Sequence, residues 1–172
     1  HLVGLVGASN LVIAGDSAGG GLTVALLLAA RDAGQEMPAA AVCISPWADL
    51  ARADHGESPN AATDPIVRAE DTARMVSWYL AGADPLDPLA SPARADLQGL
   101  PPLLVHVGST ELLLDDAVTL AEQAEAAGVK VTLEVWPDMV HVWHLFAGRV
   151  PEATDAVARI GEFIHAELGH GA

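Results

Sequence analysis

Four short apolar segments along the chain predict β-strands. They span residues 11–14, 39–45, 103–107 and 129–136. The first three are continuous apolar runs, as expected of strands that are buried on both faces of a parallel sheet. The fourth alternates between apolar and polar positions, which is typical of a strand with one exposed face.

Longer segments between and after these strands carry apolar residues at helical spacing. Residues 18–33, 114–127 and 153–168 are predicted helices, and the glycines that follow the first two, Gly34 and Gly128, suit a C-terminal cap. The order is therefore strand, helix, strand, long insertion, strand, helix, strand, helix. This order predicts the α/β fold class, with a mostly parallel sheet flanked by helices.

The insertion lies at about residues 47–100 and contains several prolines and turn residues. One helix is predicted within it, at residues 70–80, with four apolar side chains turned inward: Met75, Val76, Tyr79 and Leu80. Residues 87–92, Asp-Pro-Leu-Ala-Ser-Pro, are expected to form a rigid turn that supports the loop after the third strand and does not contact substrate.

The first predicted strand poses a physical difficulty. It is as apolar as a central strand, yet it would expose unpaired backbone groups at a sheet edge if nothing preceded it. The expectation is therefore that residues 1–172 form the carboxyl-terminal part of a single domain, and that further strands precede them.

Composition narrows the classes of function. Of the 172 residues 51% are hydrophobic, enough for one domain with a sizeable core. The net charge of −15 would repel nucleic-acid phosphates and anionic membrane surfaces, so neither is an expected partner. No apolar run approaches the roughly 18 residues of a membrane span, and a soluble, cytoplasmic protein is expected. The lone Cys43 lies in an apolar run, which favours a small buried side chain over a nucleophile or a disulfide.

A serine among glycines follows the first predicted strand. Residues 15–19, Gly-Asp-Ser-Ala-Gly, fit the G-x-S-x-G nucleophile elbow, in which a strand turns sharply into a helix with the serine, here Ser17, at the apex. Both glycines are expected to remove side chains that would clash in this turn. A glycine-rich helix start that only permits close packing is the alternative, but the strand before and the helix after favour the elbow.

A serine nucleophile needs a base, usually a histidine oriented by a carboxylate. Glu111 lies just beyond the carboxyl end of the third predicted strand, and His141 just beyond the fourth. Two rivals are close by: Asp115, which is better placed to cap the following helix, and His144, three residues after His141. The two histidines could share a helical face, but no third ligand is suggested nearby, so no metal site is expected.

Five motifs in order carry a family resemblance: GDSAGGG, SPWADL, DPLASP, LPPLLVHVGSTELLLDDA and WPDMVHVWHLF. They resemble the carboxyl-terminal half of the bacterial hormone-sensitive-lipase-like (family IV) esterases, which are α/β-hydrolases that act on short-chain carboxylic esters. The resemblance covers essentially the whole visible chain. It implies a catalytic triad of Ser17, Glu111 and His141, and a serine hydrolase that works through an acyl-enzyme and needs no cofactor.

Other parts of the site are expected from the same motifs. The N–H of Ala18, directly after the nucleophile, should donate to the oxyanion. Trp47 and Val142 are expected either to line the acyl pocket or to belong to the core. The visible chain lacks the His-Gly-Gly-Gly segment that supplies further oxyanion donors in the family, and losing one donor costs about 10²–10³ in rate. Residues 1–172 alone are therefore expected to be unstable or nearly inactive.

Two other classes of function stay open at this point. A protein of the same fold could bind a ligand without catalysis, because fold does not determine function. The same triad could also cleave an amide, a peptide or a thioester. In the leading interpretation the partner is a small-molecule ester, and a homodimer is among the assemblies left open.

Overall fold

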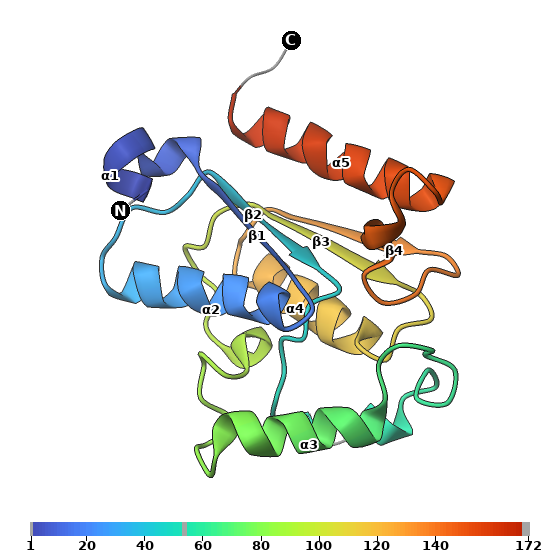
Figure 1. Ribbon diagram of the computed structural model, residues 1–172. Coiled ribbons are helices and arrows are strands. Elements are labelled where there is room, and N and C mark those ends of the chain that lie inside the picture. The colour runs from blue at the N-terminus through green and yellow to red at the C-terminus, as the bar shows by residue number, and fades with distance from the viewer. Residues whose placement is uncertain (1, 53–54, 170–172) are drawn as a thin grey trace.

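The fold is built on four parallel strands. The computed structural model describes residues 2–52 and 55–169. The strands pair in chain order as β1 (Val12–Asp16), β2 (Ala40–Ile44), β3 (Leu103–Gly108) and β4 (Val131–Trp136) (Figure 1). All three pairings are parallel, so the predicted α/β class is confirmed and the four carboxyl ends lie at one edge of the sheet.

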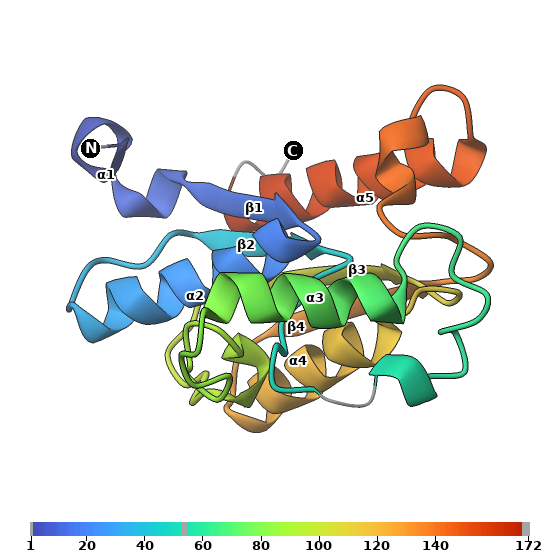
Figure 2. The same cartoon turned by 60° about the horizontal axis from the view of Figure 1, so that its bottom comes forward.

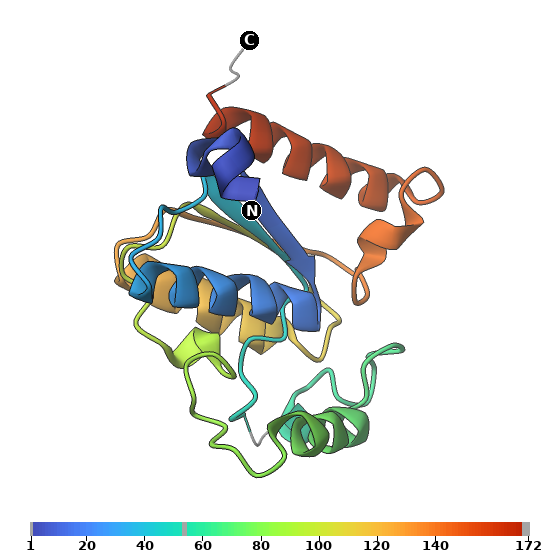
Figure 3. The same cartoon turned by 60° about the vertical axis from the view of Figure 1, so that its left-hand side comes forward.

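Helices cover both faces of this sheet. α2 (Ala18–Asp32) and α4 (Leu114–Ala126) lie on one face and α5 (Pro151–Glu167) lies on the other, as Figure 1 and Figure 3 agree. A short helix that the sequence pattern did not predict, α1 (Leu2–Val6), precedes β1. The connections contain 3₁₀ turns at Ala8–Asn10, His55–Glu57, Pro92–Arg94 and Trp143–Phe146. Across residues 2–52 and 55–169, no helix has the length and apolar character needed to cross a bilayer.

The main hydrophobic core lies between the sheet and the pair of helices α2 and α4. Val24 and Leu27 of α2, Val105 of β3 and Leu120 of α4 are all fully buried in it. Cys43 of β2 belongs to the same cluster, and burial raises the pKa of its thiol to about 12. The prediction that this cysteine is a buried apolar side chain is confirmed.

β1 lies at the edge of the described sheet, and its residues Ala14 and Asp16 are exposed. This exposure agrees with the expectation that further strands precede it. The strand also continues beyond residue 14, because Gly15 pairs with Cys43 and Asp16 pairs with Ile44. An apolar run shows that a segment suits burial, but the position of a strand in the sheet depends on its neighbours.

The helix predicted within the insertion is present as α3 (Ala69–Leu80), beyond α2 and α4 on the side away from the sheet (Figure 2). The prediction that its four apolar side chains point inward is wrong in part, because Met75 is 47% exposed and Tyr79 is 69% exposed. Val76 and Leu80 are half-buried. Periodicity identified an apolar face correctly, but this face borders a pocket and not the core.

The turn at residues 87–92 makes other contacts than those expected. The hydroxyl of Ser91 is buried and accepts the N–H of Ala51 at 3.0 Å, so the turn is held to the start of the insertion and not to the loop after β3. Leu89 and Ala90 line the pocket next to the serine elbow. The expected support of the acid loop is therefore not what these contacts show, and the absence of a contact with substrate stays a prediction.

Candidate active site

Ser17 lies at the turn between β1 and α2, where the elbow motif predicts it. Its backbone adopts φ 55° and ψ −123°, a conformation that residues other than glycine rarely occupy. Its N–H donates to the carbonyl of Ile44 at 2.8 Å, and its carbonyl accepts the N–H of Trp47 at 2.9 Å. Such strain costs about 1–3 kcal/mol and persists only where the surroundings hold it. Here the end of β2 and the segment after it hold the turn.

Gly15 and Gly19, the two glycines of the elbow motif, have different structural roles. A Cβ on Gly15 would lie 2.1 Å from the carbonyl oxygen of Gly19, so any side chain there would push α2 away from β1. A Cβ on Gly19 would meet none of the described atoms outside its own helix within 4 Å. The prediction that a side chain would clash is therefore wrong for this residue. Gly19 lines the pocket, and its missing side chain leaves room there.

Ser17, His141 and Glu111 form a continuous hydrogen-bonded chain. Oγ of Ser17 lies 2.9 Å from Nε2 of His141, and Nδ1 of His141 lies 2.8 Å from Oε2 of Glu111. Glu111 is fully buried and His141 is 8% exposed. Because an ionised carboxylate only accepts hydrogen bonds, Nδ1 of His141 carries the proton and Nε2 is free to accept from the serine hydroxyl. This arrangement can take the serine proton and stabilise the imidazolium that results.

The loops that carry the acid and the base pack directly against each other. A Cβ on Gly108, at the end of β3, would lie 2.1 Å from the carbonyl oxygen of Met139, so only glycine permits this approach. His141 follows β4 in a tight turn, with left-handed backbone at Asp138 (φ 61°) and Val142 (φ 52°). The turn brings Nδ1 of the imidazole within 2.8 Å of the carboxylate of Glu111, which follows the neighbouring strand β3.

Two polar residues of the insertion hold the acid loop, and sequence reasoning did not identify them. The amide of Asn60 donates to the carbonyl oxygens of Ser109 at 3.0 Å and Glu111 at 2.9 Å. Oδ2 of the buried Asp64 accepts the N–H of Leu112 at 2.7 Å. These contacts join residues about fifty positions apart, so no local sequence motif predicts them.

The rival acid lies away from the base. Asp115 is in the first turn of α4, where its carboxylate contacts the guanidinium of Arg52 at 3.2 Å, and its side chain is 48% exposed. The N-cap position belongs to Leu113, so the expected capping role of Asp115 is not what the structure shows. Glu111 is the carboxylate that reaches His141.

The rival base, His144, is buried against another histidine. Its Nε2 lies 3.0 Å from Nδ1 of His106, on the central strand β3. Burial lowers the pKa of His106 to about 3, with a contribution from His144, and burial lowers the pKa of His144 to about 4 against an opposing effect of Asp16. In the part of the chain that the structure describes, no three His, Cys, Asp or Glu side chains are grouped to hold a metal ion.

We expect this histidine pair to make stability depend on pH in the acidic range. The pKa of each histidine is lowered from 6.5 to about 3 or 4 by folding. Between these values and about pH 6.5 the unfolded chain binds more protons, so the free energy of unfolding falls as the pH falls, by at most about 1.4 kcal/mol per pH unit for each histidine. Urea unfolding between about pH 4 and pH 7 measures the slope.

The matched variants are H144Q and H165Q. His165 is exposed on α5 and its replacement should keep the wild-type slope, whereas H144Q should flatten it because one of the two titrating groups is gone. Equal slopes in both variants would show that the buried pair is not the origin of the pH dependence.

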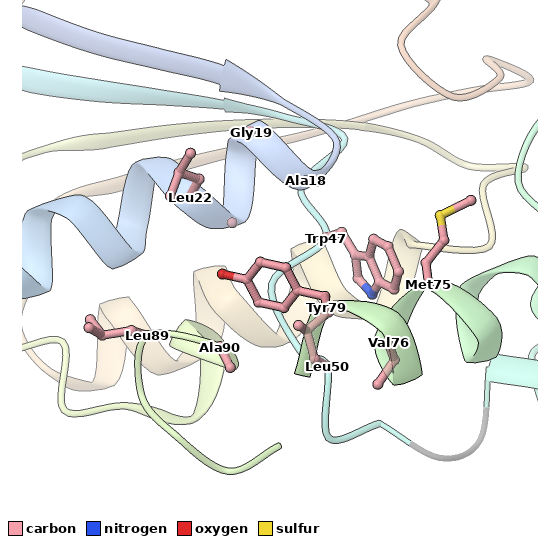
Figure 4. Close-up of a pocket in the computed structure, with 11 residues that line it drawn as sticks. Ala18, Gly19, Leu22, Trp47, Leu50, Met75, Val76, Tyr79, Leu89 and Ala90 are labelled. Atoms are coloured by element: carbon pink, nitrogen blue, oxygen red, sulfur yellow. The ribbon is translucent and has the colours of Figure 1, made fainter. Parts of the chain in front are cut away.

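An apolar pocket of about 370 Å³ opens beside the first turn of α2, between that helix, the segment after β2 and α3 (Figure 4). Trp47 lines it, and its expected role in an acyl pocket stays a prediction. Val142 does not line it: this residue is buried, and its N–H donates to the hydroxyl of Ser45. Ala18, the first residue of α2, borders the pocket, and N–H groups in a first helical turn lack acceptors within their helix. The lining residues are Ala18, Gly19, Gly21, Leu22, Trp47, Leu50, Met75, Val76, Tyr79, Leu89 and Ala90.

A family model described as the alpha/beta hydrolase fold matches residues 5–145. The chain belongs to the alpha/beta hydrolase family. Among similar sequences, an acetyl-hydrolase of Streptomyces hygroscopicus is 52% identical over 162 residues, which cover 94% of this chain and 54% of that protein. An esterase of Acinetobacter venetianus is 37% identical over 155 residues, which cover 90% of this chain and 51% of that protein.

Solved structures of this alpha/beta hydrolase family agree in fold. An esterase from the bacterial hormone-sensitive lipase family superposes with a TM-score of 0.90 at 52% identity, over 94% of this chain and 54% of that one. EstE5 soaked with ethyl alcohol superposes with a TM-score of 0.93 at 48% identity, over 98% of this chain and 57% of that one. The resemblance to hormone-sensitive-lipase-like esterases is confirmed. The alpha/beta hydrolase chain spans about half the length of these relatives.

Proposed function

We propose that the protein is a serine hydrolase that cleaves short-chain carboxylic esters through an acyl-enzyme intermediate. The hydrogen-bonded chain of Ser17, His141 and Glu111 carries this proposal, because it joins a nucleophile, a base and an orienting carboxylate at distances of 2.9 and 2.8 Å. The similarity to an acetyl-hydrolase and to esterases supports the same bond type. This chemistry requires neither a metal nor an organic cofactor.

The first half of the reaction forms the acyl-enzyme. Oγ of Ser17 attacks the acyl carbon while Nε2 of His141 takes the hydroxyl proton, and the carbonyl oxygen becomes an oxyanion. The N–H of Ala18 donates to that oxyanion, and the carboxylate of Glu111 stabilises the imidazolium. The bond to the alcohol then breaks, and His141 returns the proton to the departing alkoxide.

The second half releases the acid. Water attacks the acyl carbon of the ester on Ser17, and His141 now takes a proton from the water. The bond to Oγ breaks, His141 returns the proton to the serine, and a carboxylic acid leaves. The same base serves both halves because Glu111 keeps its Nδ1 protonated throughout.

The pocket supports a small apolar ester as the substrate. It begins at Ala18 and Gly19, directly beside the nucleophile, and its other walls are apolar or aromatic side chains such as Trp47 and Leu89. A volume of about 370 Å³ lies near the lower end of the range of about 300–1,000 Å³ for small-molecule sites. A short acyl or alcohol group suits this space better than a long chain.

Labelling with a fluorophosphonate tests whether Ser17 is activated. We expect one covalent adduct per chain, located on Ser17 by mass spectrometry of peptides. H141Q should label about 10²–10⁴ times more slowly, because it removes the base and keeps a side chain of similar size. Absence of an adduct on Ser17 in the folded protein would contradict the proposal and favour a ligand-binding role.

A second comparison tests the bond type. p-Nitrophenyl butyrate and the matched p-nitroanilide share an acyl group and differ in the atom that leaves. In the full-length protein we expect rapid turnover of the ester and slow turnover of the anilide. Faster cleavage of the anilide would assign the same triad to amides, and a matched thioester would test the remaining alternative.

A further inference from the structure

Ser45 is a buried polar residue that the triad itself does not include. It follows β2 directly, is fully buried, and has a left-handed backbone with φ 47°. Its Oγ lies 2.7 Å from Oε1 of Glu111 and accepts the N–H of Val142, the residue after His141, at 3.1 Å. We propose that Ser45 is a positioning residue of the hydrolase: its hydroxyl locks the acid carboxylate and the loop that carries the base into one arrangement.

The direction of both hydrogen bonds follows from the partners. Val142 offers a backbone N–H, so Oγ of Ser45 must accept from it. The single hydroxyl proton is then available for Glu111, whose ionised carboxylate can only accept. The hydroxyl therefore donates to the acid and accepts from the base loop at the same time, a combination that neither an alanine nor a second carboxylate could provide.

This contact determines which oxygen of Glu111 faces the base. Oε1 accepts from the Ser45 hydroxyl and also from the N–H of Gly108 at 2.6 Å. Two donors on Oε1 hold the carboxylate in one rotation, and Oε2 is left for Nδ1 of His141. Because hydrogen bonds to an ionised group are stronger than those between neutral groups, these two donors hold the carboxylate of Glu111 firmly in this orientation.

The segment around Ser45 contacts Ser17, Glu111 and the residue that follows His141. The carbonyl of Ile44 accepts from the N–H of Ser17, and the N–H of Trp47 donates to the carbonyl of Ser17. Between them, Ser45 reaches Glu111 and the residue after His141. Its own N–H donates to the carbonyl of His106 on β3 at 2.7 Å, which anchors the left-handed turn. The segment 44–47 thus joins the nucleophile, the acid and the loop that carries the base.

The test, which rests on the proposed ester hydrolysis and uses the full-length protein, compares S45A with S91A. Ser91 is a matched control: it is fully buried, and its hydroxyl also accepts a backbone N–H and donates to a backbone oxygen, at 3.0 and 2.6 Å, but it touches no triad residue. We expect S45A to lower kcat for p-nitrophenyl butyrate about 10-fold or more, with KM nearly unchanged. S45A leaves Oε1 with the N–H of Gly108 as its remaining donor, so more of the charge of Glu111 faces the imidazolium and the acidic limb of the kcat/KM profile should move to higher pH. S91A should leave this limb in place.

A spectroscopic readout separates positioning from a loss of stability. The proton between Nδ1 of His141 and Glu111 should give a far-downfield NMR resonance, which S45A shifts or broadens and S91A preserves. S45C keeps a weak donor and should have a kcat between wild type and S45A, and S45G serves in place of S45A if that variant does not fold, because glycine tolerates the left-handed backbone.

The outcomes distinguish this inference from the proposed function. If S45A and S45G both retain the wild-type kcat, pH profile and proton resonance while S17A is inactive, Ser45 has no positioning role and the hydrolase stands. If S45A changes only stability, to the same degree as S91A, the inference is also overturned. Retention of activity by S17A would instead overturn the proposed function.

Discussion

In the full-length protein, replacement of Ser17 by alanine is expected to lower kcat for p-nitrophenyl ester hydrolysis by about 10⁶-fold, because it removes the hydroxyl on which the proposed acyl-enzyme forms. The hydroxyl is the only part of the elbow that is removed. The strained backbone at φ 55° is held by hydrogen bonds to Ile44 and Trp47 that do not involve the side chain, so the variant should fold like the wild type. Initial rates on purified protein, with circular dichroism to confirm folding, measure the effect.

A suitable control is S77A. Ser77 is an exposed serine on α3, and its replacement should leave the rate unchanged. A variant S17A that kept most of the wild-type rate in a preparation free of contaminating esterase would remove Ser17 as the nucleophile. Loss of activity in both variants would point to damage of the fold and not to the chemistry.

Glu111→Gln is expected to lower kcat by about 10⁴-fold. Ser45 and Gly108 both donate to Oε1, so the amide oxygen of the glutamine will occupy that position and its NH₂ group will face His141. An NH₂ group donates to Nδ1 and thereby places the imidazole proton on Nε2. The histidine can then no longer accept the proton of Ser17, although every side chain keeps nearly the same position.

The matched variant is Asp115→Asn. Asp115 is the rival acid four residues further along, and its half-exposed carboxylate pairs with Arg52. Exposed ion pairs contribute about 0–1 kcal/mol, so this variant should keep kcat within about twofold and lose little stability. A large loss of kcat in D115N together with near wild-type activity in E111Q would reverse the assignment of the acid.

The order of the elements was predictable because strands and helices leave different local patterns. The apolar run 39–45 and the alternation in 129–136 each identify a strand of the sheet, and Gly34 and Gly128 mark the ends of helices. The serine elbow was also predictable, since a strand, a tight glycine-bordered turn and a helix lie within a few residues of each other. Such features depend on neighbours in the sequence.

The errors arise where the surroundings of an element matter. α3 has an apolar face that borders a pocket, and the turn at 87–92 lines the same pocket through Leu89 and Ala90. Val142 was expected at the pocket or in the core, and the structure places it in the core with its N–H on Ser45. A pattern of apolar residues shows that a surface needs a partner but does not identify that partner.

The sequence by itself determined the fold class, the position of Ser17 at a sharp turn, and the placement of Glu111 and His141 just beyond the ends of two strands. These properties follow from local periodicity and from turn residues. Only the tertiary structure decided that Glu111 and not Asp115 reaches the base, and that Ser45 bridges the acid and base loops. Those contacts join residues 30, 66 and 97 positions apart, and they depend on the register of parallel strands that brings the ends of β2, β3 and β4 together.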